Sequence, residues 1–199
     1  MEGTLAWTGS NYADTTGTWT FTRSEAGEAV EITRPTAIHT NFDRIHNGKD
    51  AIMVIFMGQN GGYSDVDDLI NMHRLMIDHF KGKEYIILGL SSGTASSRAS
   101  YEAAMQEAFG RRFISLREYL STALYDEDGN IISCYGLDDQ DLEMEETHTY
   151  NGTEYVTVDE IAAGTVPHQI LSDSVHYTSG TKTVIGNLIY KKMVELGIL

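Results

Sequence analysis

The pattern of apolar and polar residues changes near residue 50 of this chain. Before that point, threonines and aromatic residues alternate with polar ones in Thr4 to Trp7, Gly17 to Thr22 and Ala29 to Thr33. Such alternation is typical of strands that expose one face to water. We therefore expect residues 1–48 to form a small antiparallel β-hairpin or meander, which Pro35 ends because proline lacks a backbone N–H.

Beyond residue 50, short apolar runs alternate with segments of helical periodicity. Ala51 to Met57 and Glu84 to Leu90 are runs typical of strands buried on both faces, and Arg112 to Leu116 indicates a third. Between the first two runs, apolar residues recur at helical spacing (Leu69, Met72, Met76 and Phe80). This alternation predicts an α/β fold for residues 49–199, with a three-layer, doubly wound and mostly parallel sheet.

The remaining helices and loops are less regular. Helices are expected at about Ala99 to Phe109 and Arg117 to Leu124, and residues 125–157 form an acidic excursion rich in turns. The last helix is expected at about Ser179 to Leu196, with Thr178 as its N-cap. Four apolar residues of this helix are expected to face inward (Val184, Leu188, Ile189 and Met193).

Two short motifs carry candidate chemistry. Asp173 lies three residues before His176, a spacing that can bring a carboxylate onto imidazole Nδ1 and leave Nε2 free as a base. Asn60 follows the first apolar run among glycines, at a strand end where its amide could donate to an oxyanion. Each motif also has a simple structural interpretation, a surface pair beside a helix for Asp173 and His176, and a strand-to-helix turn for Asn60.

Taken together, these motifs resemble those of the SGNH or GDSL-type hydrolases, a family of esterases and lipases. Gly58-Gln59-Asn60 is similar to the third block of that family, with Gly61 in place of an aspartate, and Asp173 to His176 is similar to its fifth block. Tyr177 stands where proline is frequent. The resemblance implies that His176 is the general base, Asp173 its orienting acid and Asn60 an oxyanion donor.

The resemblance also implies a nucleophilic serine in a Gly-Asp-Ser block, and the sequence contains no such block. Ser10 follows a short strand without the aspartate and is interpreted as part of a turn, and Ser91 and Ser92 are expected to line the pocket. We expect the chain to be a fragment whose first strands, with the serine, lie outside it. Their absence would expose Ala51 to Met57 as an apolar edge, which predicts self-association into a homo-oligomer.

Charge and composition exclude several other classes of protein. The net charge of −15 disfavours nucleic acids and acidic membranes as partners, and no apolar run is long enough to span a bilayer. The single cysteine, Cys134, is expected to be a packed thiol, and no histidine spacing indicates a metal site. We therefore expect no metal or cofactor. The sequence leaves the compartment open: cytoplasmic as it stands, or secreted if an N-terminal segment has been lost.

The function that these observations favour is hydrolysis of a small-molecule or carbohydrate ester by a serine acyl-enzyme, with little activity in this chain alone. The first alternative is a glycan-binding module without catalysis, in which Trp7, Tyr12 and Trp19 of the hairpin stack on a sugar. Packing of these rings at an edge is the simpler interpretation. The second alternative is a nucleotide-binding protein, against which the absence of a glycine-rich phosphate loop argues.

Overall fold

The structure, a computed structural model, describes residues 2–10, 16–31, 39, 51–80, 82–173 and 175–199. The chain divides into two compact units, Met1–His39 and Thr40–Leu199, and each is described by itself.

The N-terminal unit contains the predicted hairpin. Strands β1 (Gly3–Trp7) and β2 (Trp19–Arg23) pair antiparallel, with Leu5 opposite Phe21 and Trp7 opposite Trp19. The prediction of a third strand is wrong for Ala29 to Glu31, which form no strand, while Ile32, Thr33 and Pro35 lie outside the described residues. Arg23 Nη1 donates to the carbonyl of Glu28, and this contact holds the chain after β2 in a loop.

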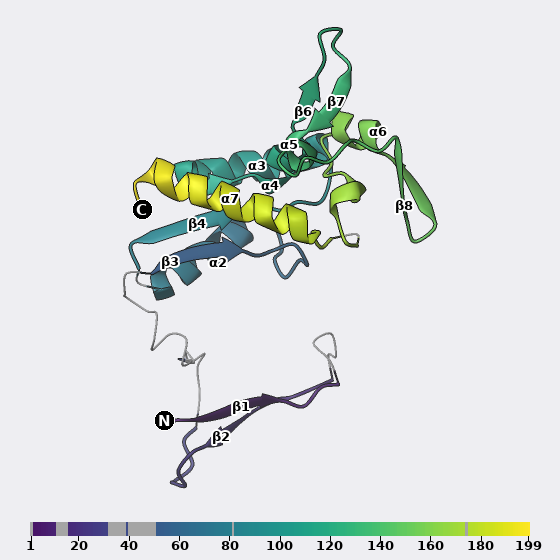
Figure 1. Cartoon of the computed structure of the whole chain (residues 1–199). Coiled ribbons are helices and arrows are strands. Elements are labelled where there is room, and N and C mark those ends of the chain that lie inside the picture. The colour runs from purple at the N-terminus through teal and green to yellow at the C-terminus, as the bar shows by residue number, and fades with distance from the viewer. Residues whose placement is uncertain (1, 11–15, 32–38, 40–50, 81, 174) are drawn as a thin grey trace. The chain divides into compact units, whose positions relative to one another are not determined.

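The larger unit is built on a parallel sheet, which confirms the α/β character predicted from the sequence (Figure 1). Its strands are β3 (Ile52–Phe56), β4 (Glu84–Leu88) and β5 (Phe113–Ile114), in the order β3-β4-β5. Helices α2 (Val66–Phe80) and α3 (Ala95–Phe109) connect them. Because all three strands run the same way, the loops that follow β3 and β4 lie at one edge of the sheet.

Successive residues of β4 pack against different helices. Ile87 lies in a core cluster with Leu69 of α2 and Met105 of α3, whereas Ile86 and Leu88 lie in a second cluster with Val184 of α7 (Ser179–Leu196). Since neighbouring side chains of a strand point to opposite faces, helices cover both faces of β4. The predicted inward residues of α7 are all in this second cluster, and the Thr178 side chain accepts the Thr181 N–H as the predicted cap.

Strand β3 is less buried than its apolar sequence predicts. Ile55 is buried, but Val54 and Phe56, which point to the other face, are exposed. The reason is that α7 packs over β4 and β5, since the cluster that contains α7 includes Ile86 and Ile114 and no residue of β3. Within the described residues, β3 pairs with β4 alone, so its second edge is unpaired.

The acidic excursion has more regular structure than the sequence indicated. It contains two hairpins, one of β6 (Ala123–Tyr125) with β7 (Ile131–Cys134) and one of β8 (Thr147–Tyr150) with β9 (Thr153–Val156). Short helices flank these hairpins: α4 (Leu116–Ser121), α5 (Tyr135–Asp138) and α6 (Thr157–Ala162). The 3-10 helices are Gly110–Arg112 and His168–Ile170.

Two predicted helices differ in their ends. Helix α3 begins at Ala95, earlier than the predicted Ala99, because Thr94 and Ser97 form a capping box. Helix α4 ends at Ser121, before the predicted Leu124, because Ala123 and Leu124 pair with β7. In the part of the chain that the structure describes, no helix is long and apolar enough to cross a membrane.

A buried ion pair joins α3 to α4 and to the loop after α6. Arg117 Nε and Nη2 donate to the two carboxylate oxygens of Glu102, at 2.7 and 2.6 Å, and Nη1 donates to the carbonyl of Gly164 at 2.6 Å. Ser115 Oγ also donates to Glu102 Oε1. Because the Arg117 and Glu102 side chains are only 5% and 15% exposed, each charge depends on the other for compensation.

We expect Arg117→Met to lower the free energy of unfolding by about 3 kcal/mol, because it leaves the Glu102 carboxylate nearly buried without a counter-charge. The matched control is Arg111→Ala, which removes an exposed pair with Glu195 and should cost less than about 1 kcal/mol. Urea denaturation followed by circular dichroism measures both. Equal losses in the two variants would contradict a special role for Arg117.

Candidate active site

The predicted base and acid lie in a tight turn just before α7. Leu171 and Tyr177 form an isolated antiparallel bridge, and the Ser172 N–H donates to the His176 carbonyl at 2.8 Å. Thr181 Oγ1 of α7 donates to the carbonyl of Ile170 at 2.8 Å. These bonds hold the turn at both ends and attach it to the first turn of α7.

Within the turn, Asp173 is bound by three donors. Its Oδ2 lies 2.6 Å from His176 Nδ1, while Oδ1 accepts the backbone N–H groups of Val175 and His176 at 2.8 and 2.7 Å. These backbone bonds and the His176 ring lower the pKa of the Asp173 carboxyl to about 2. Asp173 is therefore an ionised acceptor at neutral pH, and its orientation is set by the backbone of the turn.

The Asp173 contact determines the protonation pattern of His176. Because an ionised carboxylate only accepts hydrogen bonds, Nδ1 carries the proton of the neutral ring and Nε2 keeps its lone pair. The His176 side chain is 72% exposed, and within the described residues no group is hydrogen-bonded to Nε2. The pair thus presents an oriented, unoccupied base to solvent.

Asn60 lies in the turn that follows β3, where Gly61 N–H donates to the Gly58 carbonyl. Gly58 and Gly61 have φ values of +98° and +79°, a region that favours glycine, so the turn depends on these residues. The Asn60 side chain is exposed and makes no hydrogen bond with the described residues. An amide at this strand end is available to a ligand.

Contacts between their neighbours bring the Asn60 turn and the His176 turn to the same side of the unit. Phe56 at the end of β3 stacks on Tyr177, with ring centroids 6.4 Å apart. Gln59 and Val175, each next to a candidate residue, line one cavity. The structure thus joins Asp173 to His176 directly and links Asn60 to them through adjacent residues.

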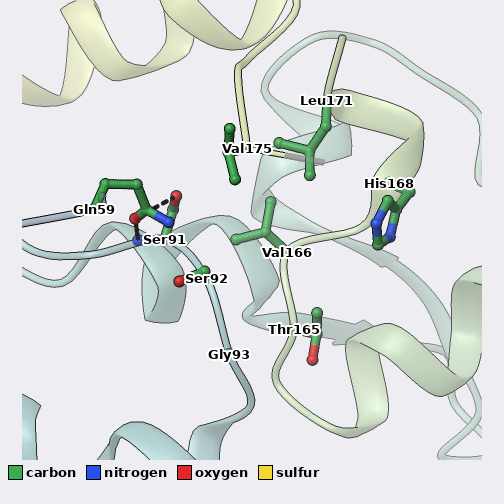
Figure 2. A pocket seen from close by; sticks show the side chains of 9 residues that line it. All are labelled: Gln59, Ser91, Ser92, Gly93, Thr165, Val166, His168, Leu171 and Val175. Carbon is green, nitrogen blue, oxygen red and sulfur yellow. Dashed lines mark hydrogen bonds between the residues drawn. The ribbon is translucent and has the colours of Figure 1, made fainter. Parts of the chain in front are cut away.

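The cavity has a volume of about 100 Å³ and lies between the loops after β3 and β4 and the segment from α6 to the His176 turn (Figure 2). Gln59 Oε1 accepts the N–H of Ser91 at 3.1 Å on one side, and the ring of His168 lies on the other. Ser91 and Ser92 line it, as predicted. Sequence reasoning did not predict that Gln59, Thr165 and His168 line this cavity. Gln59 is the unspecified middle position of the Gly58-Gln59-Asn60 motif, and no motif or spacing marks the other two.

Tyr177, where the family resemblance leads one to expect proline, is buried beside this cavity. Its hydroxyl makes no hydrogen bond with the described residues. Burial raises the pKa of Tyr177 to about 12, and the nearby Ser91 side chain opposes that rise. Tyr177 therefore stays a neutral phenol whose stacking on Phe56 fixes the position of the residue next to His176.

Other candidate groups do not form a site. Cys134 is fully buried, and burial raises the pKa of its thiol, so it is the packed residue that the sequence predicts. His73 is buried against Phe109, and burial lowers its pKa. Among the residues that the structure describes, no group of three or more His, Cys, Asp or Glu side chains could hold a metal ion.

Comparisons of this chain with models of protein families, with curated proteins and with solved structures returned no match.

We expect the Asp173 carboxyl to titrate with a midpoint near pH 2, because backbone N–H donors contribute most of its shift. In His176→Ala the midpoint should rise but stay below that of an ordinary aspartate, since both backbone donors remain. Carboxyl ¹³C shifts in NMR measure this. A midpoint near 4 in the unsubstituted chain would contradict the hydrogen-bond pattern of the turn.

Proposed function

We propose that this chain carries the acid, the base and one oxyanion donor of a serine ester hydrolase of the SGNH type. The observation that supports this most strongly is the Asp173–His176 pair, with its 2.6 Å contact at Nδ1 and an exposed Nε2 that no described residue occupies. Val175, which lies between these two residues, lines the cavity described above. The substrate class is a small-molecule or carbohydrate ester.

In the proposed reaction, His176 Nε2 removes the proton of a serine hydroxyl as its oxygen bonds to the ester carbonyl carbon. The carbonyl π electrons move to oxygen, and the Asn60 amide donates a hydrogen bond to that oxyanion. The C–O bond to the alcohol then breaks, and His176 returns the proton to the leaving alkoxide. Water repeats the sequence on the acyl-serine, and releases the acid and the free serine.

We propose that the nucleophile lies at the edge of β3 that is unpaired within the described residues. A strand that pairs parallel to β3 would end beside the Gly58 to Gly62 turn, at the same edge as Asn60 and His176. The proposed nucleophile is a serine at the end of such a strand, outside the sequence given. A second copy of the chain that pairs with this edge would occupy the same place.

The decisive test uses the polypeptide translated from the whole reading frame, which we expect to contain an in-frame Gly-Asp-Ser block. We expect it to hydrolyse p-nitrophenyl acetate, and His176→Ala to lower kcat by about 10³-fold or more because the base is lost. Asp173→Asn should cause a comparable loss, and Asn60→Ala a loss of about 10²-fold. His148→Ala, which removes an exposed pair with Glu145, is the control.

Unchanged hydrolysis in His176→Ala would overturn the proposal. Robust turnover by the present chain alone, lost in His176→Ala, would instead show that the nucleophile lies within it. Loss of that activity in Ser10→Ala would then identify Ser10.

A second candidate function, glycan binding without catalysis, is favoured by the two tryptophans of the hairpin. Trp7 and Trp19 face each other across β1 and β2 with ring centroids 5.3 Å apart and planes tilted by 41°. Trp19 is 63% exposed, and an exposed ring offers a sugar a stacking surface. Tyr12, the third ring of this hypothesis, lies outside the described residues.

For this function we expect glycan-array binding that Trp19→Ala lowers about tenfold or more and that Asp173→Asn leaves unchanged. Phe21→Ala on the same strand controls for general disturbance of the hairpin. Binding that survives Trp19→Ala would exclude the aromatic pair as a glycan site.

A further inference from the structure

The cavity beside the His176 turn is small, and both apolar and polar side chains line it. Val166, Leu171 and Val175 are its apolar lining residues, and Gln59, Thr165 and His168 are among the polar ones. Its volume of about 100 Å³ is smaller than the roughly 150 Å³ that holds a benzene ring. It therefore suits a group of a few heavy atoms with both carbon and polar character.

Several polar groups of the wall are already engaged. Ser91 donates its backbone N–H to Gln59 Oε1, and Ser92 Oγ accepts from Arg98 Nη2 at 2.9 Å. His168 Nε2, in contrast, has no hydrogen-bond partner among the described residues. This nitrogen is not fully buried, so it is open to the cavity or to solvent.

The contacts of His168 fix both its orientation and its tautomer. Glu160 Oε2 accepts the His168 backbone N–H at 3.1 Å, and Glu160 Oε1 lies 2.5 Å from Nδ1. Tyr155 of β9 stacks on the ring, with centroids 3.5 Å apart and planes within 15°. Because a carboxylate only accepts, Nδ1 carries the proton of the neutral ring, and Nε2 of that ring is a hydrogen-bond acceptor held in place.

We propose that this cavity is a subsite for a hydroxymethyl group, whose O–H donates to His168 Nε2 and whose carbon packs on Val166, Leu171 and Val175. As a substrate subsite it rests on the proposed function, since the hydroxymethyl group would belong to the alcohol part of the ester. Carbonyl and carboxylate oxygens lack the donor that Nε2 requires. An ammonium group would leave its further donors facing the apolar lining residues.

Two pairs of probes test this on the whole chain, one for each source of a hydroxymethyl group. Methyl β-D-glucopyranoside is compared with its 6-deoxy analogue, and the glycerol ether 3-methoxypropane-1,2-diol with 1-methoxypropan-2-ol, so that each pair differs by the hydroxyl of its single hydroxymethyl group. We expect the hydroxymethyl member to bind about fivefold more tightly, the effect of one hydrogen bond. NMR titration should show saturating shifts at Ser92, Thr165 and His168.

The two pairs distinguish a sugar from a glycerol ester. Discrimination in the sugar pair alone assigns the group to a sugar, and discrimination in the glycerol pair assigns it to a glycerol ester. Equal binding within both pairs, or shifts away from these residues, would overturn the subsite.

Glu160→Gln tests the subsite in a second way, because it changes which ring nitrogen of neutral His168 carries the proton. In this variant the amide oxygen of Gln keeps the hydrogen bond from the His168 backbone N–H, so its NH2 group faces Nδ1 and donates to it. The proton of the neutral ring then lies on Nε2, which becomes a donor. We expect this variant to bind acetone, an acceptor-only probe that the unsubstituted chain rejects, and to lose most of the discrimination within the probe pairs. The control is His148→Gln, because His148 makes a similar contact with Glu145, at 2.9 Å, outside the cavity lining.

If Glu160→Gln fails to fold, the comparison of probe pairs on the unsubstituted chain decides by itself. None of these measurements needs ester hydrolysis. A protein that discriminates between the probes but fails the hydrolase test keeps the subsite and loses the proposed reaction, and the opposite result keeps the reaction and removes the subsite.

Discussion

The bidentate contact between Arg117 and Glu102 is the interaction on which the arrangement of the larger unit depends. It joins α3 to α4, and the third guanidinium nitrogen binds the carbonyl of Gly164. Gly164 has a φ of +65°, and a Cβ there would lie 3.0 Å from Arg117 Nη1 and 2.8 Å from the Cβ of Ala95. The loop after α6 can therefore take its course only because a glycine sits against this ion pair.

The path of the loop after α6 determines which side chains lie at the sheet edge where β3 and β4 end. Thr165, Val166 and His168 follow Gly164 directly and form one wall of the cavity, while Ile170 begins the segment that leads into the Asp173 turn. The Ala95 N–H, bound to the carbonyl of Ala163 at 3.0 Å, attaches the same loop to the start of α3. A buried charge pair far from His176 along the chain thus sets the position of the groups around it.

Much of this architecture could be predicted from the sequence, because local patterns report on local structure. The apolar runs at Ala51 and Glu84, the periodicity of α7 and the Thr178 cap each depend on neighbouring residues. The pairing of Asp173 with His176 was predictable for the same reason, since a three-residue spacing allows the contact. The exposure of Val54 and Phe56 was not, because it depends on which strands α7 covers. The partnership of Glu160 with His168 likewise depends on how the chain folds back after α6.

The Asp173 turn is held largely by contacts between residues no more than six positions apart. Such contacts close short loops, which cost little chain entropy and form quickly. Asp173 and His176 can therefore pair before any distant strand is in place, and their geometry does not depend on the proposed nucleophile. The Asp173–His176 pair is in this sense formed by its own short segment. A polypeptide that pairs with the edge of β3 would find the His176 ring already oriented.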